Sequence, residues 1–104
     1  MKTFILMTKL APQDADIIEV ASKLQNYERQ GGAWQEQIKK KCPEVNFLAH
    51  YALLGPYDFM DIYEAPDEES AAKVSMLSRA NGAYQVESWL AIPGKKIAEL
   101  VKDL

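Results

Sequence analysis

The sequence predicts an α+β protein of the ferredoxin-like kind, in which a four-stranded antiparallel sheet is built in the order β-α-β-β-α-β-α. Two observations lead to this fold class. Four short β-rich segments alternate with segments whose apolar residues recur at helical spacing, and a Gly-Pro step joins the two central strands as a hairpin. Since 104 residues allow one modest core, residues 1–104 are expected to form a single domain.

The N-terminal half is expected to contain one strand and two helices. "TFILMTKL", residues 3–10, is the strand, and Ala11-Pro12 ends it. A helix is then predicted to begin near Asp14 or Asp16, with its apolar stripe at Ile17, Ala21, Leu24 and Tyr27. Gly31-Gly32 interrupts the helical pattern, either as a simple break or as the hinge of a lid. The second helix is predicted to have Trp34, Ile38 and Cys42 on one face before Pro43 stops it.

The central hairpin fixes which residues face one another. Residues 45–54 and 57–65 are expected to be its strands, joined at Gly55-Pro56 by a type II′ turn in which the glycine supplies the positive φ. Leu54 then pairs with Tyr57, and counting back along both strands places His50 opposite Asp61.

The C-terminal half is expected to contain helix, strand and helix. "PDEESAAKVSMLSRAN" reads as a helix capped by Asp67 and ended at Asn81-Gly82, and its buried stripe is Ala71, Val74 and Leu77. Residues 83–92 form the last strand. Pro93 opens a final helix, whose apolar positions are Ile97, Leu100, Val101 and Leu104.

Alternation along the strands divides the sheet into two sides. The side of His50 and Asp61 also contains Leu48, Ala52, Tyr57, Phe59 and Tyr63, and we assign Gln85, Glu87 and Trp89 to it. The opposite side, with Phe47, Tyr51, Leu53, Met60 and Ile62, suits packing under the helices. The first side is therefore expected to be uncovered, and its aromatic surface is too large to leave in water. We expect a homodimer or higher homo-oligomer in which two sheets pair into a dimeric α/β barrel.

Composition excludes several classes of partner and compartment. The net charge is −3 with both signs interspersed, so neither nucleic acid nor an anionic membrane is an expected partner. No apolar run is long enough to span a membrane, and no signal peptide is recognised. Cys42 is the single cysteine, so no intramolecular disulfide is expected and we predict a cytoplasmic protein.

One stretch resembles a known family. "GPYDFMDIYEAPDEESAAKV", preceded by "MTKLAP" and followed by "ESWLAIP", is similar to the GYD domain family, named for a turn represented here by Gly55, Tyr57 and Asp58 with Pro56 within the motif. The resemblance extends over essentially the whole chain and is strongest over residues 42–93. It implies membership of the dimeric α/β-barrel superfamily. That superfamily includes monooxygenases, isomerases, haem-dependent enzymes and amino-acid-sensing domains, so it leaves the function and any cofactor open.

The candidate site consists of His50, Tyr57, Asp61, Tyr63, Glu87 and Trp89. His50 could be a base whose tautomer Asp61 fixes, or the two could form a structural pair that sets the subunit register. The aromatic residues could stack on a flat ligand or pack in an interface. Their spacing matches no metal-ligand motif, so no metal is expected. Asp58 is expected to accept hydrogen bonds from backbone N–H groups near Gly55.

Three functions remain open on these observations. The first is a homo-oligomeric module that binds a small molecule in a cavity on the open sheet face. The second is a small cofactor-independent enzyme of the monooxygenase or isomerase kind, with His50 as base oriented by Asp61. The third is a purely structural assembly protein. The sequence names neither a reaction nor a ligand.

Overall fold

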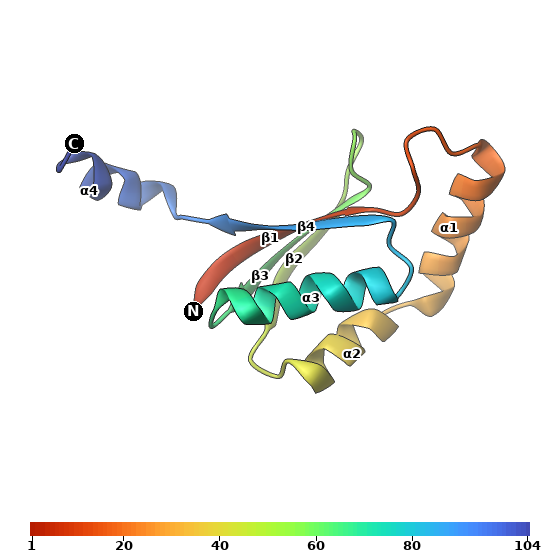
Figure 1. Cartoon of the computed structure of the whole chain (residues 1–104), viewed down its shortest axis with the longest axis horizontal. Coiled ribbons are helices and arrows are strands. Elements are labelled where there is room, and N and C mark those ends of the chain that lie inside the picture. Colours follow the sequence, from red (N-terminus) through yellow and green to blue (C-terminus); the bar gives the residue numbers. More distant parts are fainter.

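The structure is a computed structural model that describes all residues, 1–104. Its strands are β1 (Lys2–Lys9), β2 (Asn46–Ala52), β3 (Phe59–Ala65) and β4 (Gln85–Ala91). Its helices are α1 (Ile17–Gln30), α2 (Ala33–Lys41), α3 (Glu68–Ala80) and α4 (Ile97–Val101), with a 3₁₀ turn at Gly94–Lys96. The sheet has the order β2-β3-β1-β4 and is antiparallel throughout. The predicted fold class is confirmed (Figure 1).

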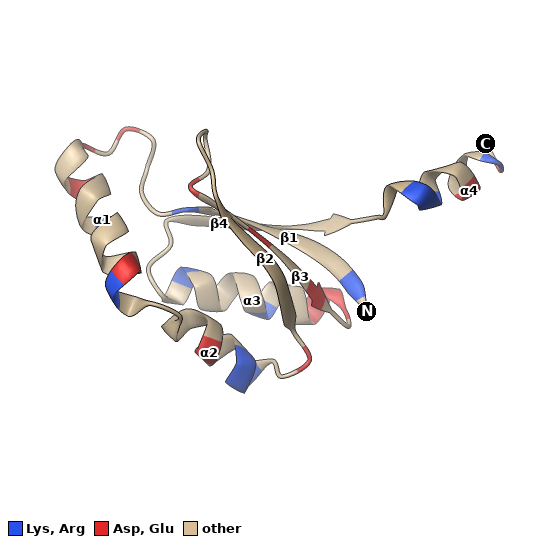
Figure 2. Ribbon diagram, turned by 180° about the vertical axis from the view of Figure 1, so that it is seen from behind, with Lys and Arg blue, Asp and Glu red and all other residues tan.

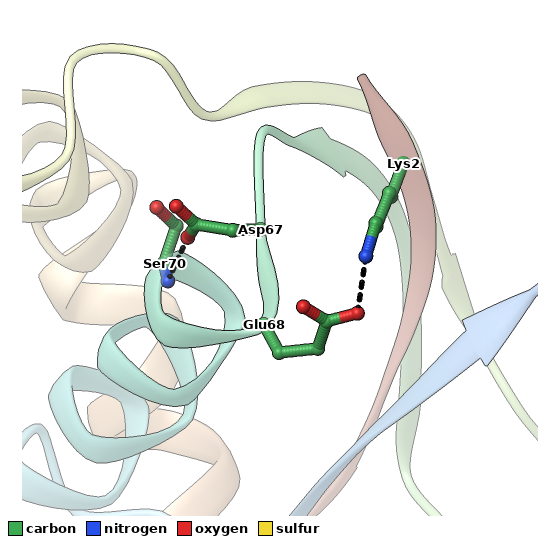
Figure 3. Close-up of polar contacts among 4 residues, drawn as sticks. All are labelled: Lys2, Asp67, Glu68 and Ser70. Atoms are coloured by element: carbon green, nitrogen blue, oxygen red, sulfur yellow. Dashed lines mark hydrogen bonds and ion pairs between the residues drawn. The ribbon is translucent and has the colours of Figure 1, made fainter.

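Local chemistry sets the ends of the helices. The Asp16 carboxylate caps α1 by accepting from the backbone N–H of Glu19, at 2.8 Å, and Asp67 caps α3 by accepting from that of Ser70, at 2.8 Å. Figure 3 shows the second cap beside the ion pair of Lys2 with Glu68, which joins β1 to the start of α3. Gly31 ends α1 at a φ of 57°, a conformation that favours glycine.

The hydrophobic core lies between one face of the sheet and the helices α2 and α3, which lie on the same side (Figure 1). Trp34, Ile38 and Cys42 are all buried, which confirms the predicted apolar face of α2. The core residues are Phe4, Leu6, Trp34, Ile38, Cys42, Val45, Tyr63, Ala65, Ala71 and Val74.

Helix α1 forms where the apolar spacing predicts it, but its apolar stripe is not part of the core. No residue of α1 is buried, and the Ile17 side chain is 82% exposed. Only Tyr27, near its C-terminal end, packs against the core. The helix therefore lies beside the sheet rather than over it (Figure 1).

The predicted register of the hairpin is confirmed, because His50 pairs with Asp61. The predicted face is wrong. Asp61 is 1% exposed and Tyr63 is fully buried, so both lie under the helices. The residues of β4 divide between the two faces in the same way. Ser88 pairs with the buried Leu6 and therefore lies on the covered face, whereas Trp89 pairs with Ile5 and lies on the uncovered face. Alternation places the following residues on the uncovered face: Ile5, Met7, Lys9, Tyr51, Met60, Ile62, Glu64, Gln85, Glu87 and Trp89.

Two local features of the hairpin also differ from the prediction. Phe47 pairs with Tyr63 while Ala49 pairs with Ile62, so Leu48 is an extra residue in β2. This β-bulge moves Phe47 to the covered face, where its ring packs against that of Tyr63. The connection is also longer than a two-residue turn. Its last ladder bond runs from the Leu53 N–H to the Asp58 carbonyl, at 2.9 Å, and Gly55 does not have a positive φ.

After β4 the chain leaves the body of the molecule. Residues 93–104, here called the arm, contain the 3₁₀ turn and α4 and project beyond the end of the sheet (Figure 1, blue). The arm has no buried residue. None of the helices is both long enough and apolar enough to cross a membrane.

Candidate functional site

The predicted site residues lie in two groups on opposite faces of the sheet. His50, Asp61 and Tyr63 are on the helix-covered face. Glu87 and Trp89 are on the uncovered face, and Tyr57 joins them there from the loop before β3. The structure therefore does not bring these residues together as one site.

On the covered face, His50 is held from two sides. Its Nδ1 lies 2.6 Å from Oδ1 of Asp61, and its Nε2 lies 3.1 Å from the hydroxyl of Tyr27 on α1. When Asp61 is ionised and the ring is neutral, Nδ1–H donates to the carboxylate and Nε2 accepts from the tyrosine. The rings of His50, Phe59 and Tyr27 stack in series, with 5.3 Å between the centroids of the first two and 4.5 Å between those of the last two. Tyr27 thus connects helix α1 to the hairpin through a hydrogen bond to His50 and a ring stack on Phe59.

Burial controls the electrostatics of this group. It raises the pKa of the Asp61 carboxyl above its usual range, while the hydrogen bond and charge of His50 act in the opposite direction. It also raises the pKa of Tyr27, and the nearby charge of Asp61 adds to that rise. The tyrosine hydroxyl therefore stays protonated at neutral pH and can serve as a donor.

A small cavity adjoins the pair. It lies between the sheet and the helices and has a volume of about 30 Å³. Its lining residues are Thr8, Leu10, Tyr27, Gln30, Trp34, Phe59, Asp61, Ser78, Asn81 and Ala83. This space holds about two or three water molecules at roughly 10–15 Å³ each.

Tyr63 is a core residue. Its ring stacks on Phe4, with 5.5 Å between centroids, and its hydroxyl lies 2.9 Å from that of Ser88. Ser88 in turn contacts the hydroxyl of Ser75 on α3, at 2.7 Å. This chain satisfies the buried tyrosine oxygen and joins β3 to β4 and α3. In this structure, the Tyr63 side chain has no free surface for a ligand.

On the uncovered face, Glu87 is the centre of a polar cluster. Tyr57 donates its hydroxyl to the Glu87 carboxylate, and this hydrogen bond lowers the pKa of Glu87 and raises that of Tyr57. The Gln85 amide and the Trp89 indole are at the edge of hydrogen-bonding distance from it, at 3.4 and 3.5 Å. The Lys9 ammonium lies 5.5 Å from the centre of the Tyr57 ring. The cluster is a polar and aromatic group at the edge strand, beside the apolar middle of the face.

The aspartate of the predicted turn motif has a different partner from the expected one. Oδ2 of Asp58 accepts from the backbone N–H of Leu10, at 2.8 Å, and the Asp58 N–H donates to the carbonyl of Thr8, at 2.8 Å. Asp58 therefore joins the hairpin loop to the end of β1, and it does not cap N–H groups near Gly55.

Sequence reasoning missed Tyr27 as a partner of His50, because it assigned this residue only to the apolar stripe of α1. The available signal was a hydroxyl at the end of that stripe, since a tyrosine facing a core needs a partner for its oxygen. No cluster of three or more histidine, cysteine or acidic side chains forms a metal-ligating group.

The chain is similar in sequence or in fold to several known proteins. It is 31% identical to the "Glutamine synthetase and cystathionine beta-lyase binding protein" of Thermus thermophilus, over 100% of this chain and 99% of that protein. Among solved structures, TTHA0845 from Thermus thermophilus aligns with a TM-score of 0.51 and 21% identity, over 90% of this chain and 96% of that one. FFRP-DM1 aligns with a TM-score of 0.51 and 15% identity, over 88% of this chain and all of that one. These two structures share the fold. The sequence model of the GYD domain matches residues 4–101, and the chain therefore belongs to the GYD domain family.

Proposed function

We propose that this protein is a homo-oligomeric protein-binding module, and that its uncovered sheet face is the contact between two copies. The observation behind the proposal is the composition of that face. It contains Ile5, Met7, Tyr51, Met60, Ile62 and Trp89 with no helix over them. Tyr51 and Trp89 are 55% and 46% exposed. Tyrosine, tryptophan and methionine are enriched in protein interfaces.

A second copy suits this face better than solvent does. Two antiparallel sheets pack face to face about 10 Å apart, with interdigitating side chains. The charged groups of the face are Lys9 and Glu87, beside the edge strand β4, and Glu64, at the far end of β3. The apolar side chains in the middle of the two central strands can therefore meet across the interface. A twofold axis lets each copy offer the same surface.

The relative from Thermus thermophilus supports a role in binding other proteins. Its name describes it as a binding protein for two enzymes, and it aligns over the full length of both chains. We therefore propose that the assembled protein binds an enzyme partner, with glutamine synthetase and cystathionine β-lyase as the first partners to test.

The arrangement of His50 favours this reading over catalysis. A general base needs a ring nitrogen that can reach a substrate proton. In this protein Asp61 occupies one nitrogen and Tyr27 the other, and the adjoining cavity holds only about two or three waters. We propose a structural role for the pair.

The oligomer is tested by light scattering after size exclusion at micromolar concentration. We expect the wild-type protein to elute as a dimer or larger species, and Tyr51→Glu with Trp89→Glu to elute at 11.7 kDa, because the interface would bury unpaired charges. Met76→Glu is the matched control, since Met76 is exposed on α3. A wild-type protein that is monomeric, or a control that also dissociates, contradicts the proposal.

The enzyme partner is tested separately. Immobilised protein is exposed to purified glutamine synthetase and to purified cystathionine β-lyase of the same organism, with an unrelated metabolic enzyme as control. We expect saturable binding of at least one of the two. Absence of binding to both would remove these enzymes as partners and leave the self-association test unaffected.

A small molecule is a second candidate, suggested by the cluster of Tyr57, Glu87 and Trp89 on the uncovered face. Two copies facing each other would place two such clusters beside a shared interior. Native mass spectrometry of the purified protein tests this idea, because a retained ligand adds mass to the oligomer. We expect this mass to be lost in Glu87→Gln if the carboxylate binds the ligand.

A further inference from the structure

The arm has no support within its own chain. It contains four large apolar side chains that are at least half exposed: Ile97, Leu100, Val101 and Leu104. Its helix, α4, has only five residues. Isolated helices shorter than about 12 residues are marginal in water, even for the best helix formers. The arm therefore needs a surface that its own chain does not provide.

Helix α1 is the second unpartnered element. None of its residues is buried, and Ile17 and Ile18 are 82% and 77% exposed at its first turn. The same end is acidic, since it contains Asp14, Asp16 and Glu19 and no basic residue (Figure 2). The start of α1 is therefore an exposed apolar patch, Ile17 and Ile18, flanked by the acidic residues Asp14, Asp16 and Glu19.

The charges of the arm are complementary to this patch. Lys95 and Lys96 precede its apolar residues and Lys102 lies among them, so the three lysines outnumber the two acids, Glu99 and Asp103. Both surfaces thus combine exposed aliphatic side chains with charges of opposite net sign.

Geometry prevents the two elements from meeting within one molecule. The arm and α1 project from opposite ends of its 52 Å length, as Figures 1 and 2 both show. A twofold axis perpendicular to the long axis reverses the second copy. The arm of each copy then lies at the end where the α1 of the other copy projects, and the contact forms twice.

We propose that the arm of one copy packs on the first turns of α1 in a second copy. The proposal rests on the self-association proposed above and adds a separate contact to it. Strands of seven residues at about 3.3 Å each, in a sheet of four strands about 4.8 Å apart, give the sheet face a footprint of about 23 by 19 Å, or about 440 Å². Each partner of a standard interface contributes roughly 800 Å² of accessible surface. The two arm contacts extend the buried area toward that size.

Crosslinking between two differently tagged chains tests the contact. One chain has Leu100→Cys on the arm and the other has Ile18→Cys on α1, and both have Cys42→Ala. A short bis-maleimide is added to the mixture. We expect a crosslinked product of twice the chain mass that contains both tags. The matched control replaces Ile18→Cys with Met76→Cys, which is exposed on α3, and we expect no such product from it.

Charge reversal provides the second test. Lys95→Glu with Lys96→Glu in the arm chain should reduce the crosslinked fraction. Asp14→Lys with Glu19→Lys in the α1 chain should restore it, and neither change touches the α1 cap, Asp16. Rescue by the paired reversal would identify the two surfaces as partners.

The outcomes separate this proposal from the one on which it rests. Crosslinking that is equal with Ile18→Cys and Met76→Cys, or absent with both while the wild type remains oligomeric, overturns the arm contact and leaves the sheet interface standing. A wild-type protein that is monomeric at every concentration overturns both.

Discussion

At the scale of single residues, the central feature is an imidazole with two partners from different parts of the chain. Asp61 is the more buried partner and Tyr27 the more distant in sequence. Burying a carboxylate is unfavourable unless a cation or a hydrogen-bond donor accompanies it. His50 supplies that donor, and its second nitrogen then binds the one residue of α1 that packs on the core.

Removing the tyrosine hydroxyl should weaken this tie without removing the ring stack. We expect Tyr27→Phe to lower the free energy of unfolding by about 1 kcal/mol, the usual contribution of one hydrogen bond. Chemical denaturation followed by circular dichroism provides the measurement. Tyr84→Phe is the matched control, because Tyr84 is half exposed and has no side-chain hydrogen bond, and it should leave the free energy unchanged. Equal effects of the two variants would argue against the tie.

The buried carboxyl of Asp61 should give stability a characteristic pH dependence. Its folded pKa lies above its unfolded value, about 3.9 for an aspartate, because of burial. The folded state therefore binds the proton more tightly, and the contribution of Asp61 to stability falls as pH rises through this window. Asp61→Asn lacks the titration. We expect the free energy of unfolding of the wild type, relative to this variant, to decrease as pH rises above the unfolded value of about 3.9. A relative increase would show that His50 outweighs burial.

The sequence was sufficient to predict the pairing of His50 with Asp61 but not its surroundings. Pairing follows from counting along two strands that share a short connection, and the count survives although the turn type differs. The contact with Tyr27 depends on how α1 packs against the sheet. No periodicity in the sequence specifies that angle.

At the scale of elements, the covered face is the instructive case. Alternation determines which residues share a face, but it does not determine which face the helices cover. Both faces of this sheet contain aromatic residues. Tyr63 and Phe4 belong to the core, and Tyr51 and Trp89 lie on the other side. Because His50 and Asp61 are polar, the face that contains them was predicted to be the uncovered face. The β-bulge at Leu48 has no signal in the residue pattern and moved Phe47 as well.

The two capped helices should differ in their response to loss of the cap. Helix α3 packs Ala71 and Val74 into the core, whereas α1 has no fully buried residue. We therefore expect Asp67→Ala to lower the midpoint of thermal unfolding, because the cap and the core unfold together. Asp16→Ala should leave the midpoint nearly unchanged and accelerate hydrogen exchange of the α1 amides. Exchange of α1 as slow as that of α3 in the wild type would contradict this view.

At the scale of the whole molecule, three surfaces lack a partner within the chain: the uncovered sheet face, the start of α1 and the arm. A chain of this length has little core with which to offset so much exposed apolar surface. Self-association would bury all three with one symmetry operation. Folding and assembly would then be linked, so the apparent stability of the protein would depend on its concentration.

That linkage gives the last prediction. For a dimer that unfolds to separate chains, a tenfold increase in concentration stabilises the folded state by about 1.4 kcal/mol per dimer. Over a hundredfold range of concentration, we expect the midpoint of thermal unfolding to rise by about 5 °C. Scanning calorimetry at several protein concentrations measures this rise. Tyr51→Glu with Trp89→Glu should make the midpoint independent of concentration, whereas Met76→Glu should keep the wild-type slope. A wild-type midpoint that does not change with concentration would mean that each chain is stable with all three surfaces in water.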